Sequence, residues 1–255
     1  MSETRVRWVP TPKHLLRVGC ISDVTAGWTP GSVLEMGAGT GDVTSRFVER
    51  GFSFTCYDIG EESRRLVAER FANEPAVTVV ETLDELPEGE FDYLMAFEVL
   101  EHVVDDSGVL AGWVRHLAPG GRALFSVPAH QRKFDDQDRV VGHVRRYERD
   151  ELADLLAGAG LVDIEVINYG FPLGNATRLA QKLGRKVSGR TVGDAVDPDE
   201  QVDRSVDSGI ETAGWMSRFA PILRPGVFKP FTLGQRLTYR RDWGDGYVAT
   251  GRLPS

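Results

Sequence analysis

Two carboxylates and two imidazoles in this chain have spacings that could gather them around one point. Glu98, Glu101 and His102 stand at i, i+3 and i+4, which places all three on one face if the segment is helical. His143 follows about 40 residues later, in a predicted loop. Mixed oxygen and nitrogen donors suit Mg²⁺, Mn²⁺ or Zn²⁺. The set therefore predicts a divalent cation site made of Glu98, Glu101, His102 and His143.

The same residues allow two other interpretations. Acidic residues at the start of a helix are stabilised by the helix dipole without any ion. In that case His143 or His102 could act as a general base, because an imidazole titrates near neutral pH. Either histidine could also be structural and satisfied by a neighbouring carbonyl. The three interpretations remain open at this point.

A second group with chemical potential is a glycine-rich turn after an apolar run at 33–36. Glycines stand at Gly37, Gly39 and Gly41, and a helical pattern begins at residue 43. Strand, glycine turn and helix together bring a ligand close to bare backbone at a helix N-terminus. The dinucleotide fingerprint G-x-G-x-x-G would need glycine at position 42, where this chain has Asp42. Anionic Glu35 and Asp42 favour a cationic ligand over a pyrophosphate.

This segment resembles motif I of the class I S-adenosylmethionine-dependent methyltransferases, and the resemblance continues in order over residues 30–170. It implies that Asp58 accepts hydrogen bonds from the ribose hydroxyls. It also implies that the loop at 81–87 flanks the adenine, where the family often has Asp in the place of Thr82. The implied cofactor is S-adenosyl-L-methionine, and the implied contacts are Glu35, Gly37, Gly39, Gly41, Asp58, Thr82, Leu83, Phe97 and Glu98.

The Glu-x-x-Glu-His element with its later histidine is similar to that of metal-assisted 2′-O-methyltransferases acting on small RNA ends. Its first half also resembles the metal-assisted catechol-type O-methyltransferases of quinone biosynthesis. Both resemblances imply a divalent cation that engages hydroxyl groups of the acceptor. By contrast, His130 and Lys133 precede an acidic cluster at 135–138, which favours a solvated loop. His14 and His116 have no chemical neighbours in sequence, which favours structural roles.

Apolar runs alternate with helical patterns along most of the chain, which is typical of a parallel sheet covered by helices. The predicted strands are 33–36, 52–57, 77–80, 91–97, 122–127, 162–168 and 246–253. The predicted helices are 12–26, 43–50, 62–71, 109–117 and 150–159. With the resemblance, this predicts an α/β fold: a Rossmann-like seven-stranded sheet, mostly parallel, with an antiparallel last strand and a helical insertion before it.

Residues 1–170 and 246–255 are expected to form the cofactor-binding domain, and residues 171–245 an insertion. The stretch 187–211 is polar and acidic, which predicts a mobile segment. The stretch 215–233 is apolar and aromatic, which favours a lid or substrate wall over the acceptor. A helical pair on the sheet edge, or a homodimer contact, explains the same composition equally well.

Charge and composition limit the kinds of molecule that this chain is expected to bind. The net charge is −8, because an excess of acidic residues in 1–170 outweighs an excess of basic residues in 171–255. The acidic part argues against long contacts with nucleic acid. The mildly basic remainder leaves room for an anionic or partly apolar small acceptor. No apolar run is long enough to span a bilayer, the first residues lack a signal peptide, and Cys20 and Cys56 are isolated, so we expect a cytoplasmic protein without a transmembrane segment.

The function expected from the resemblance is methyl transfer from S-adenosylmethionine to a small molecule, most often at oxygen, in bacterial secondary metabolism. One alternative is methylation of a lipid-linked or glycan precursor, which the apolar stretch 215–233 favours. Another, from a different class, is a catalytically silent methyltransferase-like domain that acts as a binding partner.

Overall fold

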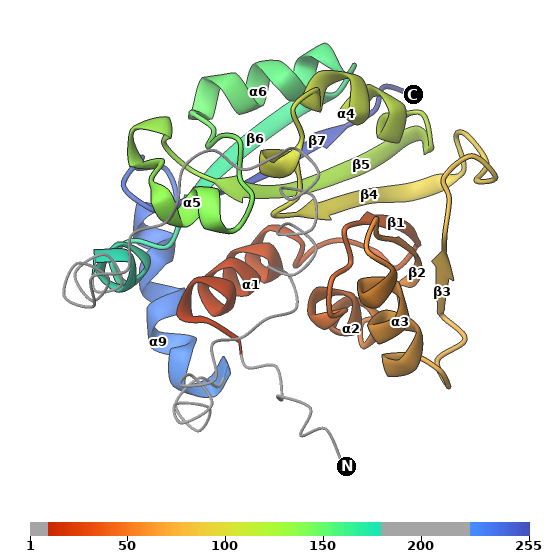
Figure 1. The fold of residues 1–255 in the computed structure, drawn as a ribbon, viewed down its shortest axis with the longest axis horizontal. Helices are drawn as coiled ribbons and strands as arrows, with labels where there is room; N and C mark the ends of the chain where they lie inside the picture. The colour runs from red at the N-terminus through yellow and green to blue at the C-terminus, as the bar shows by residue number, and fades with distance from the viewer. Residues whose placement is uncertain (1–9, 180–224) are drawn as a thin grey trace.

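Seven strands form one sheet in the computed structural model, which describes residues 10–179 and 225–255. The order across the sheet is β3-β2-β1-β4-β5-β7-β6 (Figure 1). β1 to β5 pair in parallel, whereas β7 runs antiparallel to both β5 and β6. The strands are β1 Ser32–Met36, β2 Ser53–Tyr57, β3 Val77–Val80, β4 Phe91–Phe97, β5 Leu117–Pro128, β6 Val162–Tyr169 and β7 Gly246–Arg252. The predicted fold class and all seven predicted strands are confirmed.

Helices cover both faces of this sheet. α1 (Pro12–Val24), α2 (Asp42–Val48) and α3 (Glu61–Arg70) lie on one side, and α4 (Asp106–Val114) and α6 (Arg149–Gly158) lie on the other (Figure 1). Each face has its own cluster of buried apolar side chains. A sheet buried on both faces explains why its central strands read as continuous apolar runs.

One sequence prediction about local structure is wrong. The segment that begins at Glu98 is not the start of a regular helix, because Glu98 has a left-handed φ of 57° and Val99 is also non-helical. A single 3₁₀ turn, η1 (Leu100–His102), follows, and α4 begins only at Asp106. The i, i+3, i+4 argument therefore fails for Glu98, and tertiary contacts decide its position.

The loop after β5 is also more ordered than predicted. It contains the 3₁₀ turn η2 (Gln131–Lys133) and the short helix α5 (Asp136–Val140), which Asp135 caps. Asp138 is buried in this loop rather than solvated. The acidic cluster at 135–138 therefore includes one carboxylate that lies in the protein interior.

The described part of the insertion packs on the first helix. α9 (Pro225–Gln235) lies beside α1 (Figure 1), where Gln235 donates a hydrogen bond to the carbonyl of Leu16 at 2.9 Å. A methyl group added at Gly19 would lie 2.6 Å from Thr232, so the two helices approach closely here. The predicted mobile stretch 187–211 lies outside the described residues, as does most of 215–233. None of the described helices has the length and apolar character needed to cross a membrane.

Candidate active site

The glycine turn joins β1 to α2 at the carboxyl edge of the sheet. Gly37, Gly39 and Gly41 have φ values of 70°, 55° and 68°, which side chains other than glycine rarely adopt. A methyl group at Gly37 would also lie 2.5 Å from Val99 Cγ2, so the turn is sterically closed on that side. The amide of Gly37 donates to the carbonyl of Tyr57 at 2.8 Å, which ties the turn to β2. The turn thus presents backbone rather than side chains to a ligand.

Asp58 stands directly after β2 and touches this turn. Its Oδ2 accepts from the Gly39 amide at 3.0 Å, and its Oδ1 accepts from the Gly60 amide at 2.9 Å. Each carboxylate oxygen has a further lone pair for a ligand hydroxyl. Asp58 is therefore held against the glycine turn by two amides, and its contact with a ribose remains a prediction.

Glu35 is placed differently from what its sequence position suggested. Its side chain is buried, and Oε2 accepts from the Thr44 hydroxyl at 2.6 Å and from Cys56 Sγ at 3.8 Å. Burial raises the pKa of Glu35 to about 7. The carboxylate thus fastens α2 to β1 behind the glycine turn, and this support is the contribution to ligand binding that the geometry provides.

Asp42 also directs its charge into the protein. Its Oδ2 accepts from His14 Nε2 at 2.9 Å and from Arg46 Nε at 3.1 Å. Burial alone would raise the pKa of Asp42, but the His14 hydrogen bond and the Arg46 charge bring it below its usual range. His14, expected to be structural, therefore lies on α1 against the glycine turn. His116 does serve the fold, with Nδ1 at 3.0 Å from the Pro87 carbonyl.

The remaining predicted cofactor contacts lie along the same edge of the sheet. The Thr82 hydroxyl accepts from the Asp84 amide at 3.2 Å, which shapes the loop after β3. Leu83 packs against the apolar cluster on the α4 and α6 face. Phe97 is the last residue of β4 and is largely buried. The contact of these three residues with a cofactor remains a prediction.

Glu98 is bound to the first helix. Its Oε2 lies 2.7 Å from Lys13 Nζ, and its Oε1 lies 3.4 Å from Arg17 Nη1. Ser126 Oγ also donates to Oε1 at 3.2 Å. Burial alone would raise the pKa of Glu98, but the charges of Lys13 and Arg17 hold it well below the usual range. Glu98 is thus not part of the predicted cation group, because its charge is already neutralised by α1.

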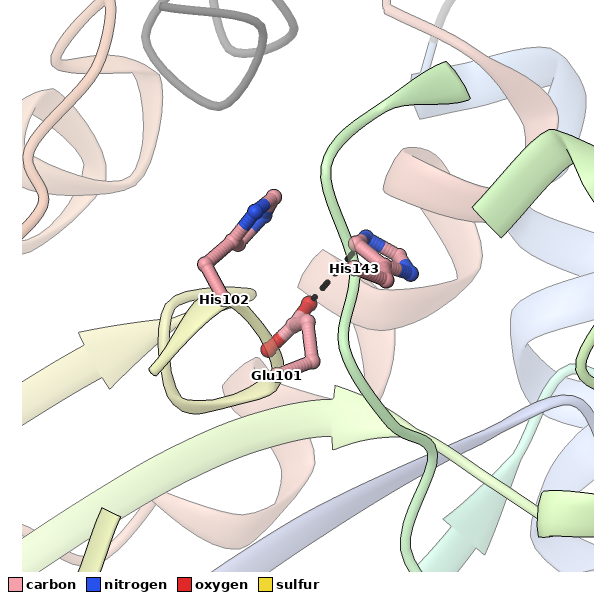
Figure 2. Close-up of side chains that lie close together, drawn as sticks. All are labelled: Glu101, His102 and His143. Atoms are coloured by element: carbon pink, nitrogen blue, oxygen red, sulfur yellow. Dashed lines mark ion pairs between the residues drawn. The ribbon is translucent and has the colours of Figure 1, made fainter. Parts of the chain in front are cut away.

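Glu101 is the least satisfied of the candidate residues. It is fully buried, and neither carboxylate oxygen has a hydrogen-bond partner among the described residues. Burial, reinforced by the nearby negative charge of Glu98, raises the pKa of Glu101 well above its usual value. Its Oε1 points at His143 Nε2, 3.7 Å away (Figure 2). A buried carboxylate in this condition costs free energy unless something compensates it.

His102 and His143 complete the cluster. His102 leaves the same turn as Glu101, and His143 enters from the loop after α5 (Figure 2). Their ring centroids are 4.8 Å apart, and one ligand atom from each of Glu101, His102 and His143 lies within 4.8 Å of the others.

Both imidazoles have their Nδ1 atoms on acceptors. His102 Nδ1 donates to the Gly142 carbonyl at 3.1 Å, and His143 Nδ1 donates to Asp138 Oδ1 at 3.0 Å. Burial lowers the pKa of His102 to about 4 and also lowers the pKa of His143. Both rings are therefore neutral near pH 7, with Nε2 as the nitrogen that carries a lone pair. Three of the four predicted ligands thus come together, without Glu98.

Three contributors to the site were missed from the sequence. Lys13 and Arg17 neutralise Glu98 from more than 80 positions away, and Asp138 holds His143. Lys13 and Arg17 carry no motif. The spacing of Asp135 and Asp138, which form a capping box at α5, was a signal that this acidic stretch is structured.

Comparison with known proteins agrees with this geometry. A family model described as a methyltransferase domain matches residues 21–166. Relatives include ubiquinone biosynthesis O-methyltransferases of Idiomarina loihiensis, 32% identical over 117 residues (44% of this chain, 48% of theirs), and Pseudomonas fluorescens, 36% identical over 118 residues (44% and 50%). The chain thus matches about half the length of these curated relatives.

Solved structures agree in fold. Phosphoethanolamine N-methyltransferase 2 of Haemonchus contortus, in complex with S-adenosyl-L-methionine, superposes with a TM-score of 0.58 at 16% identity, over 95% of this chain and 53% of its own. A structure described as a sarcosine dimethylglycine methyltransferase of Galdieria sulphuraria gives 0.58 at 15% identity, over 100% and 92%. With the matched family model, the glycine turn and the sheet order, the chain belongs to the class I S-adenosylmethionine-dependent methyltransferases.

Proposed function

We propose that this protein transfers a methyl group from S-adenosylmethionine to a hydroxyl oxygen of a small molecule, assisted by a divalent cation bound to Glu101, His102 and His143. The observation that carries the proposal is the state of Glu101, a fully buried carboxylate without a hydrogen-bond partner among the described residues. Two neutral imidazoles stand within 4.8 Å of it. One carboxylate oxygen and two neutral imidazole nitrogens form a donor set that suits Zn²⁺, Mn²⁺ or Mg²⁺. A cation binding there would displace the proton that the raised pKa of Glu101 retains.

The cofactor would be held by the glycine turn and Asp58. The backbone at Gly37, Gly39 and Gly41 would accommodate its methionine end, and Asp58 would accept from the ribose hydroxyls. S-Adenosylmethionine supplies an electrophilic methyl group. The chain's own task is to hold the acceptor oxygen behind that methyl group and to exclude water.

The Glu101 cluster stands beside the carboxyl end of β4, the edge where ligands bind in open α/β sheets. Glu101, His102 and His143 would hold a cation that would polarise a hydroxyl group and lower its pKa. Glu101 would offset the added positive charge, and the Nδ1 hydrogen bonds of His102 and His143 fix both rings. The same geometry also suits His143 as a general base without an ion, since Nε2 of a neutral imidazole can accept the proton of an acceptor hydroxyl.

The acceptor class follows from this chemistry. A hydroxyl beside a second oxygen offers a cation two ligand atoms, as in a catechol, whereas a lone phenol offers one. Relatives named O-methyltransferases support oxygen as the methylated atom. We also propose that the 171–245 insertion forms a wall of the acceptor site. The described helix α9 supports this because it packs on α1, which supplies Lys13 and Arg17 to Glu98.

The test is methyl transfer to 3,4-dihydroxybenzoate compared with 4-hydroxybenzoate, followed as S-adenosylhomocysteine production with and without Mn²⁺. We expect turnover of the catechol only, abolished by EDTA and restored by Mn²⁺. S-Adenosylhomocysteine affinity should stay unchanged by EDTA, which separates loss of the cation from loss of the cofactor site. Full activity of a preparation shown to be metal-free by elemental analysis would eliminate the cation and leave His143 as the base.

A further inference from the structure

His143 is held from behind by a second carboxylate. Asp138 Oδ1 accepts from His143 Nδ1 at 3.0 Å, on the side of the ring opposite Glu101. A carboxylate can only accept, so this contact places the ring proton on Nδ1. The Nε2 lone pair then faces Glu101 Oε1, 3.7 Å away.

Asp138 is itself fixed on every polar atom. Arg146 reaches Oδ1 from Nη2 at 2.7 Å and from Nε at 2.9 Å, and the Asp135 amide donates to Oδ2 at 2.9 Å. Arg178, from the segment after β6, lies 3.6 Å from Oδ2. Asp138 and Arg146 are both buried. A carboxylate held this tightly does not turn away from the imidazole, so the orientation of the ring is fixed as well.

We infer that Asp138 is a positioning residue, which sets the tautomer and the orientation of His143 so that Nε2 faces Glu101. What Nε2 does there, binding a cation or accepting a proton, rests on the proposed function. The tautomer itself does not, because it can be measured in the free protein without an acceptor.

The same network contains a natural control. Asp245 is buried like Asp138 and pairs with the same two arginines, with Oδ1 at 3.3 Å from Arg146 and Oδ2 at 3.8 Å from Arg178. It also lies 3.6 Å from Lys133. Within the described residues, Asp245 forms ion pairs with these cations and with no imidazole. Removing either carboxylate therefore disturbs the ionic network, but only the loss of Asp138 removes the acceptor of His143.

The first measurement is the histidine tautomer, read from long-range ¹H–¹⁵N correlations in EDTA-treated protein, with the His143 signals assigned through His143→Gln. We expect the proton on Nδ1 in the wild type and in Asp245→Ala. In Asp138→Ala this preference should be lost. A wild-type His143 protonated on Nε2 would overturn the inference without any variant, so the test stands even if Asp138→Ala does not fold.

The second measurement is Mn²⁺ affinity by calorimetry. Loss of the hydrogen-bond partner of a metal-bound histidine typically weakens metal binding by about 10–100-fold, and we expect this for Asp138→Ala. Asp245→Ala should stay within about 3-fold of the wild type, because His143 keeps its acceptor. Equal losses in the two variants would show that Asp138 serves only the network and would refute the positioning role. A wild type that binds no Mn²⁺ would instead refute the proposed cation, while the tautomer spectrum would still decide this inference.

Discussion

Two glutamates are buried at the same edge of the sheet, and the protein treats them in opposite ways. Glu35 lies in β1 and Glu101 follows the adjacent strand β4. Burial raises the pKa of both carboxyl groups. Glu35 is satisfied by the Thr44 hydroxyl at 2.6 Å, whereas Glu101 has no hydrogen-bond partner among the described residues.

The difference between the two glutamates lies in the free energy of burying each carboxyl group. An unpaired buried polar group costs about 1–3 kcal/mol, and more when it is charged. Glu35 avoids this cost through Thr44 and thereby stabilises the cofactor turn. Glu101 has no such donor, so the free-energy cost of its burial remains, and it lies beside two neutral imidazoles. A group that weakens the folded protein, in a place where a cation would compensate it, supports the proposed cation site.

The largest expected effect tests this contrast directly. Glu101→Gln removes the anionic ligand, so Mn²⁺ affinity measured by calorimetry should fall by at least about 100-fold, beyond the 10–100-fold typical of outer-shell changes. Glu35→Gln is the matched control, since it removes the same carboxyl group from a comparably buried position. Its Mn²⁺ affinity should equal that of the wild type. The contrast fails if both variants bind the ion as the wild type does.

The next effect concerns the cofactor side of the site. Asp58→Ala should weaken S-adenosylhomocysteine binding by about 1.5–3 kcal/mol, through loss of charge-assisted hydrogen bonds to the ribose. Asp92→Ala is the control, because Asp92 likewise accepts from a backbone amide, that of Ser32, at 2.8 Å, but at the other end of the sheet. An Asp58 variant with unchanged calorimetric affinity would show that the ribose site lies elsewhere.

The glycine turn and the position of Asp58 beside it were predictable, because residues close in sequence determine the backbone conformation there. Three glycines within five residues, an apolar run before them and Asp58 after the next strand determine the turn and its neighbour. A parallel sheet covered by helices also follows from the alternation of apolar runs and helical patterns. Backbone conformations of this kind depend on residues that are close in sequence.

The positions of Glu98 and His143 were only partly predictable, because ion pairs and hydrogen bonds with residues outside the predicted group determine them. Glu98 leaves the predicted cation group since Lys13 and Arg17 neutralise it from α1. His143 is oriented by Asp138, which the sequence placed in a solvated loop. Pairings of this kind depend on how α1 and the loop after β5 pack at the end of the sheet, and one sequence carries no periodic signal for them.

A smaller effect concerns stability as a function of pH. The pKa of Glu35 is raised to about 7 in the folded protein, above the ordinary glutamate value of 4.5 that applies to the unfolded chain. The folded state therefore binds this proton more tightly, and the contribution to stability is full below about pH 4.5 and declines as the pH rises to about 7. Glu35→Gln should remove this decline, of which on the order of 2 kcal/mol falls between about pH 5 and 7, at about 1.4 kcal/mol per pKa unit.

The measurement is urea unfolding of the wild type and Glu35→Gln at several pH values between about 5 and 8, which bracket the raised pKa of Glu35. The difference between the two proteins isolates Glu35, because the paired carboxylates Asp42 and Asp138 contribute equally to both. Glu35→Gln should gain stability relative to the wild type as the pH rises. A difference that does not change with pH would mean that Glu35 is already ionised in the folded protein at the lowest pH measured.

The smallest expected effect comes from removing a hydrogen-bond partner of Glu35, which leaves this carboxyl group without a hydroxyl donor, as Glu101 is. Thr44→Val keeps the shape of a buried side chain but removes the hydroxyl that donates to Glu35 at 2.6 Å. Losing this hydrogen bond should cost about 1 kcal/mol in urea unfolding at about pH 5, where Glu35 is neutral, and somewhat more at about pH 8, where the carboxylate is charged. Thr44→Ser keeps the hydroxyl and loses only a methyl group, so its cost should not change with pH. If Thr44→Val and Thr44→Ser show the same pH dependence, the Thr44 hydroxyl does not stabilise the Glu35 carboxylate, and the contrast between the two glutamates loses its physical basis.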